Sequence, residues 1–230
     1  MVITGAMKNR DDAREAKFEE ILQFVKGVAE AAFEKAGASH GWDHTLRVVA
    51  LCERMGPGEG ADMHVLCLAA YLHDIGRPRQ DASAGALCHA EVGREMARPL
   101  LEPLDLLPEQ KENILHCIGS HRFRGNNHPR TIEAKVLFDA DKLDSIGAVG
   151  VARAFQFAGE VGAVLHNPDV DVAQTQAYTK NDTGYREYRV KLSKIKDRMM
   201  TGQGRRMAVS RHEFMEAFFQ RFLEEYEAGK

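Results

Sequence analysis

His73 and Asp74 are the strongest sign of chemistry in this chain. They follow directly on the apolar run 65–72. A charge buried beside such a run is costly unless it is paired or binds a metal ion. The run itself holds no cation, and Arg77 is expected to leave with the turn that follows. The doublet therefore predicts half of a metal site, which residues from elsewhere in the chain must complete.

A lone His-Asp doublet is more often a surface pair than a ligand pair, so the prediction depends on further donors. His44 is one candidate, because it lies near the start of an expected helix with an apolar stripe. Asp141 is another, because Leu137 and Phe138 lie one helical turn before it. An aspartate on a buried stripe needs a compensating group, and a metal ion supplies one.

Two other aspartates share the segment of Asp141. Asp139 has Lys135 and Lys142 at helical spacing, so it is expected on an exposed face with ion pairs. Asp144 borders the stripe of Asp141 and is expected to lie beside the ion or the substrate. The predicted ligands are therefore two imidazoles and two carboxylates: His44, His73, Asp74 and Asp141.

The order of these residues resembles the HD-domain metal-dependent phosphohydrolase superfamily, whose pattern is a histidine, a later His-Asp pair and a distal aspartate on a helix. Four segments resemble its stand-alone bacterial subfamily similar to YedJ and YpgQ: 40–48, 139–155, 201–206 and 211–215. The resemblance covers most of the chain. It implies an HD-type helical bundle and, as in some members, nucleoside triphosphate pyrophosphohydrolase activity.

Two more histidines are similar in position to the extra ligands of dinuclear HD phosphodiesterases. These are His89 and His121, but Arg122 stands where those enzymes have a second adjacent histidine. We therefore expect one ion, with His89 and His121 lining the pocket as phosphate donors or proton carriers; capping or surface roles are equally compatible. Arg77 and Arg122 are the expected phosphate contacts, and Asp74 is expected to orient the attacking water as well as to bind the ion.

The predicted ligand set suits Mn²⁺, Mg²⁺, Fe²⁺ or Zn²⁺. Such an ion activates water and polarises a phosphoryl oxygen. The predicted function is hydrolysis of a phosphate ester or anhydride of a small molecule, expected to be a nucleotide. Two alternatives stay open: a non-catalytic regulatory module that binds metal or nucleotide, and a helical scaffold with structural histidines.

Helical periodicity dominates the chain and predicts one all-α domain over 1–230, with a core of about 12–160 and a C-terminal helical lobe of about 185–228. The expected helices are 12–36, 44–55, 62–74, 89–101, 108–121, 131–144, 146–159, 186–200 and 203–228. Asp43 or Ser39 is expected to cap the second of them and Asp62 the third. Residues 56–58 are expected to stop a helix, and 77–87, 122–130 and 160–184 are expected to be irregular.

The composition is that of an ordinary globular protein, with 44% hydrophobic and 28% charged residues in 230. The net charge of −3 gives no basic field, so nucleic-acid binding is not expected. The cysteines form no CxxC pair and are expected to be reduced: Cys52, Cys67, Cys88 and Cys117. No signal peptide or apolar stretch of ~20 residues is present, which predicts a cytoplasmic protein without a membrane partner. Homo-oligomerisation is left open.

Overall fold

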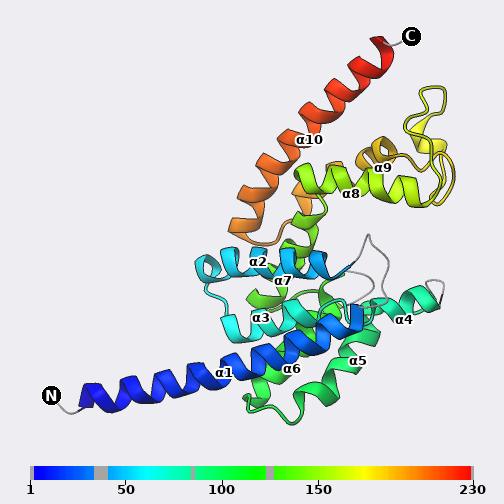
Figure 1. Ribbon diagram of the computed structural model, residues 1–230. Coiled ribbons are helices and arrows are strands. Elements are labelled where there is room, and N and C mark those ends of the chain that lie inside the picture. The colour runs from blue at the N-terminus through cyan, green and yellow to red at the C-terminus, as the bar shows by residue number, and fades with distance from the viewer. Residues whose placement is uncertain (1–2, 34–40, 84–85, 123–126, 229–230) are drawn as a thin grey trace. The chain divides into compact units, whose positions relative to one another are not determined.

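In the computed structural model, helices joined by turns and loops make up the residues described, and none of these residues lies in a strand (Figure 1). These residues are 3–33, 41–83, 86–122 and 127–228, with side chains described from residue 14 onward. The all-α prediction is confirmed. No helix among them is long and apolar enough to span a membrane. The chain forms two compact units, Met1–Leu137 and Phe138–Lys230, and the prediction of one domain stays a prediction.

The first unit is built around α3 (Met63–Leu72), whose residues from Val65 to Leu72 are all buried. This helix packs against α1, α2 and α6, while α5 packs against α4 and α6. The bounds are α1 Ile3–Phe33, α2 Trp42–Glu59, α4 Arg77–Ala82, α5 His89–Leu101 and α6 Pro108–Ser120. The unit also contains the first part of α7 (Ile132–Asp144). Because α3 is enclosed by three helices, the residues that follow it begin inside the core.

An aspartate side chain caps the start of α3, whereas a glycine ends α2. Asp62 caps α3 as predicted, since its carboxylate accepts from the backbone N–H groups of His64 and Val65 at 2.9 and 3.3 Å. The expectation that residues 56–58 stop the preceding helix is wrong, because α2 runs through Pro57 to Glu59. It ends at Gly60, whose φ of 73° is the left-handed conformation that glycine adopts readily.

Two other local expectations in this unit are wrong. Residues 77–82 form the short helix α4 instead of a loop, helped by Pro78 in its first turn, where no backbone donor is needed. Asp43 lies inside the first turn of α2 and does not cap it; the cap position is Gly41, which has no side chain to contribute. The other cap candidate, Ser39, and the expected end of the first helix at 36 lie outside the described residues.

The second unit contains the remainder of α7, α8 (Gly147–Glu160), α9 (Gly184–Val190) and α10 (Gly202–Ala228). Aromatic rings join the last three: Tyr188 stacks on Phe219 with centroids 4.4 Å apart, and Phe155 lies 6.2 Å from Phe219. The predicted helix over 186–200 is wrong. It stops at Val190 and gives way to two short 3₁₀ turns, Leu192–Lys194 and Lys196–Arg198.

Asp139 is completely buried, so its predicted exposure is wrong. Its carboxylate accepts from the backbone N–H of Met200 at 2.9 Å and of Thr201 at 2.8 Å, and from the Thr201 hydroxyl at 2.7 Å. Burial raises the pKa of the Asp139 carboxyl, and these hydrogen bonds offset part of that rise. Asp139 thus fastens α7 to the start of α10 within the second unit.

Candidate metal centre

The His73 ring is fixed by the end of the helix that precedes it. Its Nδ1 lies 2.7 Å from the carbonyl oxygen of Ala70, and its side chain is fully buried. A carbonyl oxygen can only accept, so Nδ1 must carry the hydrogen. In the neutral ring, Nε2 is therefore a bare lone pair directed away from α3.

His121 repeats this arrangement at the end of α6. Its Nδ1 lies 2.7 Å from the carbonyl oxygen of Ile118, which again assigns the hydrogen to Nδ1. The His121 side chain is 2% exposed. Two helix ends in the first unit thus direct imidazole Nε2 atoms into the buried interior.

Asp74 lies at the centre of four imidazoles. Its Oδ1 is 3.2 Å from His89 Nε2 and 3.5 Å from His121 Nε2. Its Oδ2 is 3.8 Å from His73 Nε2 and 3.9 Å from His44 Nε2. All five side chains are nearly inaccessible to solvent. One donor atom each from Asp74, His89 and His121 lies within 4.8 Å of the other two, a spacing that suits a shared metal ion.

The electrostatics of this cluster keep the Asp74 carboxylate ionised. Burial raises the pKa of the Asp74 carboxyl, but His73, Arg77, His121 and His89 together hold it well below its usual range. Burial is also the main reason that the pKa of His89 is lowered to about 2, so this ring is neutral. The Nε2 atoms of His73 and His121 lie 3.8 and 3.5 Å from this carboxylate. Such a set of nitrogen and oxygen donors suits a divalent transition metal.

Arg77 stays beside the doublet, and the expectation that it leaves with the turn is wrong. Its Nη2 lies 3.1 Å from Asp74 Oδ2, and its side chain is 16% exposed. Arg77 opens α4, and this short helix holds the guanidinium back against the carboxylate three residues earlier. A partly exposed guanidinium therefore borders the buried cluster.

Close backbone packing brings α5 to the doublet. A Cβ atom on Gly76 would lie 2.3 Å from the carbonyl oxygen of His89 and 2.6 Å from the backbone nitrogen of Gly93. Both contacts are shorter than real Cβ atoms make, so only glycine fits at position 76. This approach is what places His89, the first residue of α5, against Asp74.

The two remaining predicted site aspartates belong to the second unit. Asp141 Oδ2 lies 2.6 Å from Lys142 Nζ, with the Asp141 side chain 18% exposed. Asp144 is buried, and its Oδ2 lies 2.5 Å from Nη1 of Arg153. The buried position of Asp144 is thus explained by an ion pair inside its own unit, and the parts that both residues play at the site stay predictions.

Sequence reasoning missed Gln80 on α4. Its Oε1 lies 3.2 Å from the backbone nitrogen of His89, 2.8 Å from His89 Nδ1 and 2.7 Å from Arg122 Nη1. No spacing or motif singles out a glutamine in a segment expected to be a loop. The contact between Gln80 and His89 becomes visible only in the structure, where residues 77–82 form a helix.

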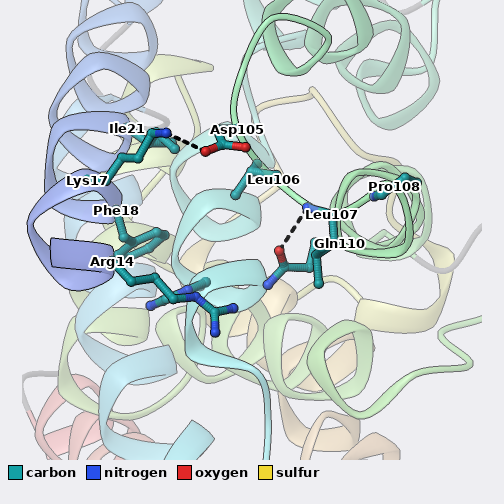
Figure 2. A pocket seen from close by; sticks show the side chains of 10 residues that line it. Arg14, Lys17, Phe18, Ile21, Asp105, Leu106, Leu107, Pro108 and Gln110 are labelled. Atoms are coloured by element: carbon teal, nitrogen blue, oxygen red, sulfur yellow. Dashed lines mark hydrogen bonds and ion pairs between the residues drawn. The ribbon is translucent and has the colours of Figure 1, made fainter. Parts of the chain in front are cut away.

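Other polar groups in the first unit have structural roles. His64 stacks on Phe18 with centroids 3.7 Å apart, and His116 accepts from the backbone N–H of Arg130 at 3.0 Å. A cavity of about 460 Å³ lies between α1 and the start of α6. Figure 2 shows Lys17 and Asp105 paired on its wall. None of the predicted site residues lines this cavity.

Comparison with known proteins agrees with the helical fold. The family model described as HD domain matches residues 41–146. The uncharacterized protein YpgQ of Bacillus subtilis strain 168 is 32% identical over 191 residues, which cover 79% of this chain and 82% of that protein. The chain therefore belongs to the HD-domain family.

Solved structures give the same result over nearly the whole chain. The crystal structure of Bacillus subtilis YpgQ in complex with ADP has a TM-score of 0.72 at 27% identity, covering 91% of this chain and 96% of that one. An HD-superfamily hydrolase from Bacillus thuringiensis has a TM-score of 0.70 at 29% identity, covering 93% and 98%. The chain thus has the fold of an HD-superfamily hydrolase.

Proposed function

We propose that this protein is a metal-dependent phosphohydrolase that acts on a small phosphorylated molecule, specifically a nucleotide. One observation carries the proposal: the Nε2 atoms of four buried imidazoles lie within 4 Å of the ionised carboxylate of Asp74. The rings of His73 and His121 are held in that orientation by backbone carbonyls, independently of any assumption about the reaction. Imidazole nitrogens and carboxylate oxygens that converge in this way are the donor set of a divalent transition metal.

The proposed ligands of the ion are His44, His73, Asp74 and Asp141. For Asp141 the support is its place in the motif 139–144 and the partial burial of its carboxylate. Asp74, His89 and His121 form a second donor group that suits another ion on the other oxygen of Asp74. A bound Mn²⁺, Mg²⁺, Fe²⁺ or Zn²⁺ would supply activation of water and polarisation of a phosphoryl oxygen.

The chain's own residues supply the rest of the chemistry. Asp74 has an oxygen on each side of the cluster, so it would hold the ion and orient the attacking water. Arg77 and Arg122 would bind phosphate oxygens and stabilise the charge that develops on them. Asp144 would act indirectly by holding Arg153, since its Oδ2 is already in that ion pair.

The nucleotide substrate is supported by a relative. Bacillus subtilis YpgQ was crystallised with ADP, and its fold matches this chain over 91% of its length. The guanidinium groups of Arg77 and Arg122 border the same carboxylate and histidine cluster, where a chain of phosphates would need positive charge.

The test is release of phosphate or pyrophosphate from a panel of nucleoside mono-, di- and triphosphates with Mn²⁺ present. Wild-type protein is compared with Asp74→Asn, Asp141→Asn and the surface control Asp105→Asn. We expect both site variants to lose more than ~100-fold in rate, because even partners of metal ligands contribute 10- to 100-fold. Asp105 is exposed, so its variant should match wild type.

Two results would contradict the proposal. One is the absence of Mn²⁺-stimulated hydrolysis of every nucleotide tested. The other is an Asp74→Asn variant with unchanged activity. Tight nucleotide binding without product over long incubation would instead favour the regulatory module.

A further inference from the structure

We propose that Gln80 is a positioning residue that selects the tautomer of His89 and so turns its Nε2 lone pair towards Asp74 and His121. This inference rests on the proposed function, because it explains how His89 becomes a metal ligand. The observation that carries it is the position of Gln80 Oε1 on α4. This oxygen lies within hydrogen-bond distance of the backbone nitrogen of His89, of His89 Nδ1 and of the Arg122 guanidinium.

The identity of the shared Gln80 atom follows from its neighbours. An amide oxygen and nitrogen are hard to tell apart by shape, so the hydrogen-bond network must decide. The backbone N–H of His89, 3.2 Å away, can only donate, and so can the Arg122 guanidinium, 2.7 Å away. Two obligate donors on one atom require that atom to be the carbonyl oxygen.

The tautomer of His89 follows from that assignment. His89 Nδ1 lies 2.8 Å from the same oxygen, so Nδ1 must carry the hydrogen that is donated to it. In the neutral ring Nε2 is then bare, at 3.2 Å from Asp74 Oδ1 and 3.1 Å from His121 Nε2. A bare Nε2 cannot donate to a phosphate, so this geometry supports a ligand role for His89 over the phosphate-donor role expected from the sequence.

Arg122 provides the competing arrangement. Its Nη1 is 3.3 Å from His89 Nδ1, close enough to donate to that nitrogen if the nitrogen were bare. In that second state Nε2 would carry the hydrogen and donate to Asp74 Oδ1. The lone pair of His89 that a metal ion needs would then be occupied by that hydrogen. Gln80 prevents this, because it accepts from both Arg122 and Nδ1 and is closer to Nδ1 than Arg122 is.

The experiment compares two substitutions of one residue. Gln80→Met keeps the size of the side chain but removes the acceptor, and Gln80→Glu keeps an acceptor oxygen. The first readout is the tautomer of His89 in the metal-free protein, taken from two-bond ¹H–¹⁵N correlation spectra, with the signal assigned by its loss in His89→Gln. The second readout is Mn²⁺ affinity by calorimetry.

We expect wild type and Gln80→Glu to show a protonated Nδ1, and Gln80→Met to show a protonated Nε2. Gln80→Met should bind Mn²⁺ about 10- to 100-fold more weakly, the range found when partners of metal-ligating histidines are removed. Arg122→Met should keep the wild-type tautomer, because it removes the competitor and leaves Gln80 in place.

A protonated Nε2 in wild type, or an unchanged tautomer in Gln80→Met, overturns the inference whatever the activity. If the tautomer and affinity change as expected but no nucleotide is hydrolysed, the proposed function fails and the role of Gln80 stands. A folding defect in Gln80→Met would appear as loss of dispersion across the whole spectrum, and the Arg122→Met and Gln80→Glu results would then decide.

Discussion

Two buried polar clusters in the first unit show how a structural network differs from a ligand site. Around Glu133, every donor meets an acceptor: the backbone N–H of Asp62 donates to Oε1 at 2.8 Å, and the Asn113 amide donates to Oε2 at 2.9 Å. Asn113 Oδ1 in turn accepts from the Thr131 hydroxyl at 2.8 Å. Around Asp74, four imidazole nitrogens and the Arg77 guanidinium converge on one carboxylate, and the Nδ1 atoms of His73 and His121 are fixed by backbone carbonyls.

This difference indicates what each cluster is for. A network whose donors and acceptors match gains stability from its own hydrogen bonds. A cluster of imidazole nitrogens around one carboxylate presents the donor atoms that a metal ion binds. The Glu133 network therefore joins α3, α6 and α7 in the first unit, while the Asp74 cluster has the composition of a metal site.

The largest expected difference between the two clusters is the stabilisation of the protein by a metal ion bound at Asp74. At a Mn²⁺ concentration 100 times the dissociation constant, the free energy of unfolding should rise by about 2.7 kcal/mol. For a chain of this size that is roughly a 5–10 °C rise in melting temperature. Asp74→Asn should abolish the rise, and an excess of chelator should reverse it in wild type. Thermal unfolding with no response to Mn²⁺, Mg²⁺, Fe²⁺ or Zn²⁺ would remove the reason for treating the clusters as different.

A smaller effect is expected at the matched network. Glu133→Gln turns one acceptor into a donor that faces Asp62 N–H or the Asn113 amide, so a buried donor loses its partner. We expect a loss of about 1–3 kcal/mol in urea unfolding. The stabilisation by Mn²⁺ should be unchanged in this variant. A reduced metal response in Glu133→Gln would show that the two clusters are coupled.

The smallest effect is expected at the exposed pair of Lys17 and Asp105 beside the cavity of Figure 2. Both side chains are largely exposed, so solvent screens their attraction. Lys17→Met should leave the midpoint of the same urea titration unchanged within experimental error. A lowered midpoint would mean that ion pairing at this surface contributes to stability as the buried networks do.

Much of the fold was predictable because local signals agreed with the final packing. Proline in the first turn of α6 and an aspartate cap before α3 gave helices close to the expected bounds. The helix expected over 186–200 was wrong although Tyr188, Leu192 and Ile195 are buried at helical spacing. The helix ends at Val190 and is followed by Lys191, whose φ of −133° and ψ of −58° are not helical, and two 3₁₀ turns follow.

The residue types of the buried cluster were predictable, but the contacts that support them were not. His73, Asp74, His89 and His121 stand out because histidines and aspartates next to apolar runs need an explanation. The burial of Asp139 was not predictable, because it depends on backbone groups some sixty residues later in the chain. Gln80 was not predictable either, since nothing local distinguishes a ligand-supporting glutamine from a solvated one.

The glycine at position 76 has a consequence for how this protein can vary. The backbone of the His-Asp turn packs directly against the backbone of α5. No side chain lies between them, so mutation cannot change their separation by exchanging a larger side chain for a smaller one. Individual donors can be exchanged by single substitutions, but their spacing cannot be adjusted in small steps at this point. Proteins that evolve from this chain would therefore change their chemistry by substituting the donor residues, while the backbone spacing of those residues stays the same.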